Sequence, residues 1–286
     1  MKLKYIVKEN KTLKQVLRED LSISKRLYKK VKQDRIFVNG KQAKDYEEVN
    51  ENDIVEVDLD FNETCENIIP NPNIKVDILY EDEWLLIVNK QPFVPVHPCM
   101  ECFENSLSNG VKYYFDTHNI HKKTRIVNRL DKNTTGIVIF AKTEYIQENL
   151  GFYEKEYITI VEGTITGKGT INEPIARKDK SIIERCVSKD GQTAITEYEA
   201  IKNFTINNTK LSLAKCILKT GRTHQIRVHM SYINHPLLGD SLYGKSSNLI
   251  NRQALHAYHI QFIHPVTRKL IDVTAPIPED MENLIK

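Results

Sequence analysis

Apolar residues near the start of the chain recur with a helical period. Thr12 and Gln15 form a capping-box pattern ahead of an apolar stripe. Ser24 can cap a second helix, in which the apolar residues Leu27 and Val31 lie four positions apart. The pattern therefore predicts two short helices, each with one apolar face.

Short strands are expected after these helices. The apolar residues 36–38 lead into Asn39-Gly40, the strongest short hairpin signal, and residues 41–43 return along a second strand. Residues 54–57 are predicted to close the sheet. We expect a small α/β domain over residues 1–60.

The periodicity disappears between residues 58 and 73. This stretch is acidic, rich in asparagine and carries Pro70 and Pro72. Such a composition is typical of a connecting segment. We place the linker at residues 61–75.

Most of the remaining chain, residues 76–286, carries strand-like apolar runs. They are VDILY, WLLIVN, GIVIFA, YITIV, AITEYEAI and KLSLAKCIL. Helical patterns are fewer and irregularly placed, so a regular alternation of strand and helix is disfavoured. The sequence predicts an α+β fold with a mixed, mostly antiparallel sheet.

Composition excludes several classes of protein. The chain has 286 residues, of which 40% are hydrophobic and 28% charged, as in ordinary globular proteins. No apolar run approaches the roughly 20 residues that cross a bilayer, and lysines interrupt the start of the chain. Five cysteines without regular spacing disfavour a disulfide framework. We expect a cytoplasmic protein with no membrane partner.

Positive charge is concentrated on the second predicted helix and its exit. The net charge of +3 is small, but this segment has one acid, Asp34, against six cations: Lys25, Arg26, Lys29, Lys30, Lys32 and Arg35. A solvated helix face is one interpretation. The cations lack acidic partners at i,i+4 spacing, however, which favours contact with RNA or DNA.

An acid stands before an apolar strand in NRLDKNTTGIVIFAK, residues 128–142. Asp131 has three possible roles there: a turn-former, a calcium ligand or a catalytic group. The following residues match the opening of an EF-hand loop, but its twelfth position falls on Lys142 instead of a carboxylate. Calcium is therefore excluded, and the other two roles remain open.

A second group of polar residues lies in LKTGRTHQIRVHMSYINHPLLGDSLYG, residues 218–244. Thr223 can cap a helix there. Hydrogen-bond donors crowd its first turns: Arg222, His224, Gln225, Arg227 and His229. Such donors near a helix start suit a carboxylate or a phosphate, although a structural salt bridge is also possible.

Residues 98–102 match the P-C-x-x-C pattern of zinc-dependent deaminases. That chemistry also needs an upstream H-x-E or C-x-E. The first histidine is His97, and Cys65 is followed by Glu66 and Asn67. The motif is incomplete, so we expect no metal.

Together, several motifs resemble those of the RluA-type pseudouridine synthases. They are RLDKNTTG with the following GIVIFAK, KEYITIVEG, TGRTHQIRVH, ALHAYHIQFIHP and ILYEDEWLLIVNKQPFVPVHP. The stretch SISKRLYKKVKQDRIFVNGKQ resembles the RNA-binding domain of the ribosomal protein S-four type. The chain departs from the family pattern at Asn128, where histidine is usual, and at Gln91–Phe93 after Lys90.

This resemblance implies an enzyme that isomerises uridine to pseudouridine in structured RNA, without cofactor or metal. Large-subunit rRNA is the expected substrate. The alternatives are a tRNA pseudouridine synthase and a catalytically inactive, ribosome-associated RNA-binding protein. We expect a catalytic domain over residues 76–286 and a monomer.

The resemblance also implies roles for individual residues. Asp131 is the expected nucleophile or base, and Arg227 is its expected partner, because an unpaired buried carboxylate would protonate or destabilise the fold. A free Asp has a pKa of about 3.9 and is ionised at neutral pH. Tyr157 is expected to pack on the target ring and to assist removal of the ring proton.

Further residues are expected to contact the substrate. A uridine inside folded RNA must be flipped out of the stack to reach a pocket. Arg129 resembles the arginine that fills the vacated place, and Leu255 is expected in the apolar wall around uracil. Arg222, His224 and Gln225 are the other predicted substrate-binding residues.

Overall fold

The computed structural model describes residues 1–63, 67–100 and 102–286. Its elements in chain order are β1 (Lys2–Ile6), β2 (Lys11–Thr12), α1 (Leu13–Gln15), the π-helical η1 (Val16–Asp20), α2 (Lys25–Val31), β3 (Ile36–Val38), β4 (Lys41–Gln42), β5 (Glu48–Val49), β6 (Ile54–Asp58), β7 (Ile78–Glu81), β8 (Leu85–Lys90), α3 (Leu107–Thr117), β9 (Arg125–Ile126), β10 (Thr135–Ala141), α4 (Glu144–Asn149), β11 (Phe152–Glu162), β12 (Lys168–Asn172), β13 (Ile175–Arg177), β14 (Arg185–Val187), β15 (Ile195–Ile206), β16 (Thr209–Leu218), α5 (Gln225–Tyr232), β17 (Leu255–Ile263), β18 (Leu270–Thr274) and α6 (Glu279–Ile285).

The start of the chain folds as its local patterns predict. Thr12 and Gln15 form the expected capping box, and the Ser24 hydroxyl accepts a 3.1 Å hydrogen bond from the Leu27 amide. Asn39 and Gly40 both have positive φ, 49° and 79°, and they connect β3 to β4 as a hairpin. The first sheet has the order β1-β6-β3-β4.

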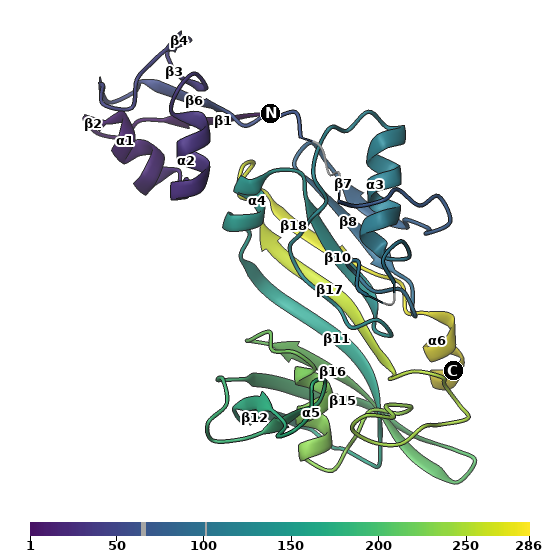
Figure 1. The fold of residues 1–286 in the computed structure, drawn as a ribbon. Coiled ribbons are helices and arrows are strands. Elements are labelled where there is room, and N and C mark those ends of the chain that lie inside the picture. The colour runs from purple at the N-terminus through teal and green to yellow at the C-terminus, as the bar shows by residue number, and fades with distance from the viewer. Residues whose placement is uncertain (64–66, 101) are drawn as a thin grey trace.

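The second part of the chain is built on a ten-stranded sheet. Its main path is β12-β15-β16-β11-β17-β10-β8-β7, with β18 paired to β17 and β9 paired to β10. All its strand pairs are antiparallel except β10 with β17. The predicted α+β class with a mostly antiparallel sheet is therefore confirmed. In Figure 1, the long strands β11 and β17 run between the two halves of this sheet.

Alternating side chains of β8 and β10 bury both faces of the sheet, because successive residues of a strand point to opposite sides. Leu86 and Val88 pack with Val138 and Phe140 under α3. The intervening residues of both strands belong to another cluster, which also contains buried residues of the first sheet. Strands β8 and β10 are thus fixed on both sides.

The parallel pair β10–β17 requires a glycine. Gly136 lies opposite Ala257, and its φ of 106° is rarely adopted by other residues. A Cβ at this position would lie 2.2 Å from the carbonyl oxygen of Ala257. Gly136 therefore allows β17 to approach the strand that follows the Asp131 loop.

Two of the predicted RNA-binding cations pair with a carboxylate of the second part of the chain. The Arg26 guanidinium lies 3.1 Å from Glu144 at the start of α4, and Lys30 also pairs with this acid. Figure 1 shows α2 next to α4. The sequence showed that these cations lack acidic partners at i,i+4 spacing. Arg26 and Lys30 nevertheless have an acidic partner in Glu144, which is distant in sequence but close in space.

The other four cations differ in their surroundings. Arg35 lies 3.5 Å from Asp58 and stacks on Phe61, 4.4 Å from its ring centre. Lys25, Lys29 and Lys32 are exposed. Arg26 is also exposed despite its pair with Glu144, so four of the six cations keep the exposed position that the charge pattern predicted.

The two cysteines of the P-C-x-x-C segment are not buried in a metal cage. Cys99 is exposed and Cys102 is half-buried, and both thiols are free. Cys65, Glu66 and Glu101 lie outside the described residues. Within the part of the chain that the structure describes, no helix is both long and apolar enough to cross a bilayer.

Candidate active site

Asp131 lies in the loop between β9 and β10, at the end of β10 that pairs with β17. Its backbone carbonyl accepts a hydrogen bond from the Thr134 amide at 3.1 Å, so the residue does close a turn. Its side chain has a second function, because Oδ2 accepts a 2.8 Å hydrogen bond from Nη1 of Arg227. The side chain is 29% exposed and so remains accessible.

Arg227 is buried on α5 and is held by a second carboxylate. Its Nε and Nη2 donate to the two oxygens of Asp240 at 2.7 and 2.9 Å, and its guanidinium lies 5.0 Å from the centre of the Tyr243 ring. Burial disfavours the charge of Arg227, but Asp240 and Asp131 outweigh this effect and raise its pKa. Arg227 thus remains charged and fixed in orientation.

The start of α5 differs from the prediction. The N-cap residue is His224, with a left-handed φ of 58°, and not Thr223. His224 Nδ1 shares a 2.8 Å hydrogen bond with the Tyr243 hydroxyl, and Nε2 lies 3.7 Å from Asp131. Burial lowers the His224 pKa, although the charge of Asp131 opposes the effect.

Gln225 supports the loop before α5 and has no spare hydrogen-bonding group for the substrate. Its Oε1 accepts from the Thr220 hydroxyl and the Arg222 amide, at 2.8 and 3.0 Å. Its Nε2 donates to Ile195 and Thr196, both at 3.0 Å. Gln225 therefore has a structural role. It also lines a hollow together with Asp131 and Tyr157, so its predicted contact with the substrate stays a prediction.

The other predicted residues surround a cavity. A hollow of about 600 Å³ is lined by Asp131, Tyr157, Arg129, Arg222 and His224, among others. Leu255 lines the adjoining hollow with Asp131 and Tyr157. A cavity of this size accommodates a nucleotide, since small-molecule pockets are typically about 300–1,000 Å³. The predicted constellation is thus assembled around one space.

Tyr157 lies in this cavity as a neutral phenol. Burial raises its pKa well above the usual range, and the negative charge of Asp131 raises it further. A neutral phenol can both donate and accept a hydrogen bond. The expected role of Tyr157 in removing the ring proton stays a prediction.

Comparisons with known proteins identify the family. Residues 84–232 match the family model for RNA pseudouridylate synthase. The chain is 39% identical over 276 residues to an uncharacterised RNA pseudouridine synthase, YjbO, of Bacillus subtilis, with 93% of this chain and 96% of that protein covered. The chain belongs to the RNA pseudouridylate synthase family. It is an RNA pseudouridine synthase of the RluA type.

Other relatives agree with this identification. The Escherichia coli ribosomal large subunit pseudouridine synthase D is 35% identical over 273 residues, covering 88% of this chain and 82% of that protein. The solved structure of human RNA Pseudouridylate Synthase Domain Containing 1 shares the fold, with a TM-score of 0.59 and 23% identity. It covers 73% of this chain and 86% of that one.

Two buried cations that the sequence patterns did not single out hold the Asp131 loop of the synthase. Lys90 Nζ donates to the carbonyls of Gln91, Val94 and Lys132 at 2.8, 2.8 and 2.9 Å. Arg252 donates to the Asn133 carbonyl at 3.3 Å. Two carbonyls directly after Asp131 are therefore fixed from the protein interior.

The environment of Lys90 also affects its charge. Burial lowers its pKa to about 7, with a further contribution from the positive charge of Arg252, whereas Asp131 opposes the shift. The three accepting carbonyls satisfy all three donors of an ammonium group. These hydrogen bonds favour the ammonium form of Lys90 and so oppose the effect of burial.

The departures from the family pattern have local roles in this synthase. Asn128 donates to the Ile137 carbonyl at 2.9 Å and accepts from the Ile139 amide at 2.8 Å, so it extends the edge of β10. Phe93 has a positive φ of 65° and is 52% exposed. Asn128 thus positions the loop through the backbone of β10.

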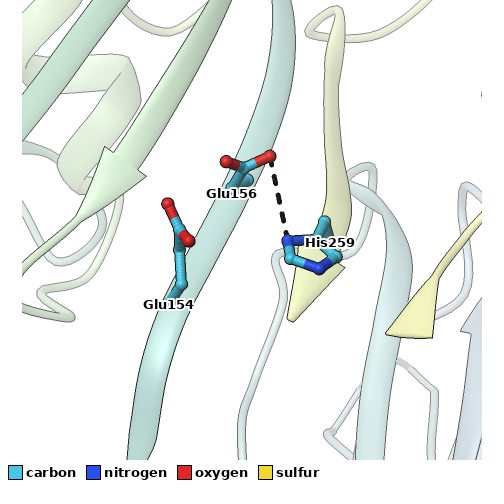
Figure 2. Close-up of side chains that lie close together, drawn as sticks. All are labelled: Glu154, Glu156 and His259. Carbon is cyan, nitrogen blue, oxygen red and sulfur yellow. Dashed lines mark ion pairs between the residues drawn. The ribbon is translucent and has the colours of Figure 1, made fainter. Parts of the chain in front are cut away.

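Among the residues that the structure describes, one group of three side chains places potential metal-ligand atoms close together. Glu154, Glu156 and His259 place their ligand atoms within 4.8 Å of one another (Figure 2). Lys215 already pairs with Glu156 at 3.2 Å, and Asp272 lies 2.9 Å from His259 Nε2. These partners account for the group as an ion-pair network. The expected absence of metal in catalysis remains a prediction.

Asp240 and Tyr243 were also missed as site residues. Both lie in the stretch LLGDSLYG, where an acid directly follows apolar residues, and Asp240 is buried. A buried acid implies a buried cation as partner. The acid at Asp240 could therefore have been recognised from the sequence as a candidate, although its pairing with Arg227 could not.

Proposed function

We propose that Asp131 is the catalytic nucleophile or base and acts on uridines of large-subunit rRNA. The observation that carries the proposal is the 2.8 Å pair between Asp131 and Arg227 at the wall of a nucleotide-sized cavity. Uracil is detached from the ribose, turned and reattached through a ring carbon, whose proton is then released. An ionised, oriented carboxylate suits attack on or proton transfer from the nucleoside while the glycosidic bond breaks.

The remaining lining residues receive positioning roles in this proposal. Tyr157 and Leu255 provide the surface against which uracil packs. Arg129 occupies the space that the uridine leaves in the RNA, and Arg222 and His224 contact the ribose and phosphate side. Extruding the nucleotide costs about a few kcal/mol, which these contacts must supply.

The test is proton release from the ring carbon. Uridine-labelled rRNA, tritiated at that carbon, is taken from a strain that lacks the gene and is mixed with excess enzyme. We expect wild type to release tritium and Asp131→Asn to bind the RNA normally but release none, since the substitution keeps shape and removes charge. Normal release by Asp131→Asn would refute the assignment.

The choice of rRNA is supported by relatives that are named ribosomal large subunit pseudouridine synthase D. Mapping pseudouridines in the rRNA and tRNA of a deletion strain tests it directly. We expect sites to disappear from large-subunit rRNA. Loss from tRNA alone would identify a tRNA enzyme, and no loss from either would indicate an inactive RNA-binding protein.

We further propose that residues 1–60 form an RNA-binding domain of the ribosomal protein S-four type, joined by the linker at 61–75 to the catalytic domain. The exposed cations Lys25, Lys29 and Lys32 support this proposal. Replacing all three with Gln is expected to weaken binding to rRNA and to reduce its salt dependence, because fewer phosphates are neutralised. The control replaces Lys168 and Lys210 with Gln.

A further inference from the structure

The hairpin of β13 and β14 exposes an apolar tip. Ile182 is 85% exposed and Ile183 is 63% exposed. They lie in the turn that joins the two strands, next to the cations Lys178 and Lys180. Two adjacent isoleucines in water suggest a surface that is covered when the protein binds its partner.

The turn holds this tip in a defined shape. The Ser181 amide donates to the Lys178 carbonyl at 3.1 Å, and the Ser181 hydroxyl accepts from the Glu184 amide at 2.9 Å. Lys178 and Glu184 form an ion pair across the hairpin at 3.1 Å. The isoleucines are therefore presented by an ordered turn.

The base of the hairpin is cationic and adjoins the catalytic cavity. A hollow of about 430 Å³ is lined by Arg177, Arg185 and Arg222, with Asp190 as the one acid among its lining residues. Arg222 and Thr223 also line the cavity that contains Asp131. The two spaces thus meet at the loop before α5.

The hairpin is attached to the framework that holds the catalytic pair. The Arg185 amide donates to the Tyr243 hydroxyl at 2.8 Å. Tyr243 also hydrogen-bonds His224 and packs on the guanidinium of Arg227. The position of the tip is therefore defined relative to Asp131.

We propose that this hairpin is a second RNA-binding site of the enzyme. The arginines at its base bind phosphates of the strand that flanks the target uridine, and Ile182 and Ile183 insert against bases next to it. Phosphates recognise clustered guanidinium groups, and apolar side chains inserted between bases hold a stack open. The inference rests on the proposed function. It adds where the RNA strand beside the target uridine runs on the enzyme.

The test compares a tip variant, Ile182→Ser with Ile183→Ser, with Ile201→Ser, which changes an isoleucine that is 52% exposed on β15. Single-turnover tritium release from labelled rRNA is measured against enzyme concentration. The tip variant is expected to need at least about tenfold more enzyme for half-maximal rate, equivalent to about 1.4 kcal/mol. Ile201→Ser and the thermal unfolding of all variants are expected to match wild type.

A second variant tests the cationic base. Arg177→Gln is expected to weaken filter binding to the same rRNA and to reduce the slope of log affinity against log salt by about 0.7–0.9, as one lost phosphate contact requires. Lys210→Gln, an exposed cation on β16, is the matched control. An unchanged slope for Arg177→Gln would contradict phosphate binding at the hairpin.

Failure of this proposal can be distinguished from failure of the proposed function. If wild type releases tritium and the tip variant does so with equal efficiency, the hairpin site is refuted and the function stands. If wild type releases none, filter binding still tests the hairpin site, because equal RNA affinities of wild type and the tip variant would refute it. Self-association of wild type that the tip variant abolishes would assign the isoleucines to a contact between two copies and overturn the proposal.

Discussion

Arg227 divides its guanidinium between two carboxylates. Nε and Nη2 hold Asp240, and Nη1 holds Asp131. Asp240 also accepts hydrogen bonds from the amides of Leu242 and Tyr243 at 3.1 and 3.3 Å, so it is itself fixed by the backbone. The position of the Asp131 carboxylate therefore depends on an acid that does not line the cavity.

Replacing Asp240 with Asn should reduce both stability and activity. The substitution leaves the buried Arg227 with one charged partner, and breaking a buried pair costs roughly 3–5 kcal/mol. A shift of Asp131 by about 1 Å is expected to slow tritium release roughly 100-fold. Urea unfolding and single-turnover rates measure the two effects. Asp272→Asn, a change of an exposed hydrogen-bonded acid, is expected to leave the rate unchanged and to alter the free energy of unfolding much less than Asp240→Asn does.

Tyr157 should stay protonated throughout the working range of the enzyme. Burial, followed by the charge of Asp131, raises its pKa above the ordinary value of about 10. The difference in phenolate absorbance between wild type and Tyr157→Phe is therefore expected only above about pH 10. A difference signal near neutral pH would show that the cavity stabilises the phenolate and would contradict this expectation.

Replacing Lys90 with Met should loosen the catalytic loop. The three carbonyls that accept from Lys90 would lose their donor, and a buried unsatisfied group costs about 1–3 kcal/mol. We expect a lower free energy of unfolding and slower tritium release, with nearly unchanged RNA binding. Equal rates for wild type and Lys90→Met would show that the loop keeps its shape without this residue.

His256 should make stability fall in mild acid. Burial lowers its pKa to about 4, with opposing and smaller contributions from neighbouring groups. Between about pH 6.5 and 4, the unfolded chain binds a proton that the folded chain does not, so stability is lost as pH falls. The loss is roughly 3 kcal/mol at most.

Urea unfolding at about pH 7 and about pH 4.5 tests this expectation. The difference between the two pH values should be smaller in His256→Asn than in wild type. His118→Asn, which changes an exposed histidine, should keep the wild-type difference. Identical pH dependence in all three proteins would contradict the role of His256.

Removing the carboxylate at Glu144 should release two cations of α2. Arg26 and Lys30 both pair with this buried acid. Glu144→Gln is therefore expected to strengthen rRNA binding at low salt and to steepen its salt dependence by about one to two phosphate contacts. Filter binding over a salt series measures both, with Glu282→Gln as control. Weaker binding would indicate that the pair holds the first sheet in the orientation that RNA requires.

Local structure was encoded by neighbouring residues. The Thr12–Gln15 capping box and the Asn39-Gly40 hairpin were predicted and confirmed, because each involves hydrogen bonds or backbone angles within four residues. The alternating and continuous apolar runs likewise predicted the strands, since burial on one or both faces determines that pattern. The family motifs also lie within short stretches.

Relationships between distant segments required the tertiary structure. The N-cap of α5 is His224, which adopts a left-handed backbone conformation, whereas the sequence predicted Thr223 as the cap. The role of Gln225 depends on strand β15 and the loop after β16, which surround its amide. The loop directly precedes α5, but β15 is distant in sequence, so local rules could not predict the contacts of Gln225 with β15.

The sequence by itself determined the elements, the α+β class and the residues that gather at the cavity. Only the tertiary structure decided that Asp240 shares Arg227 with Asp131, and that Glu144 neutralises Arg26 and Lys30. The physical reason is the separation along the chain over which each interaction acts. Hydrogen bonding and periodic burial act between near neighbours, whereas a charge is paired by whatever the strand order brings within a few ångströms of it.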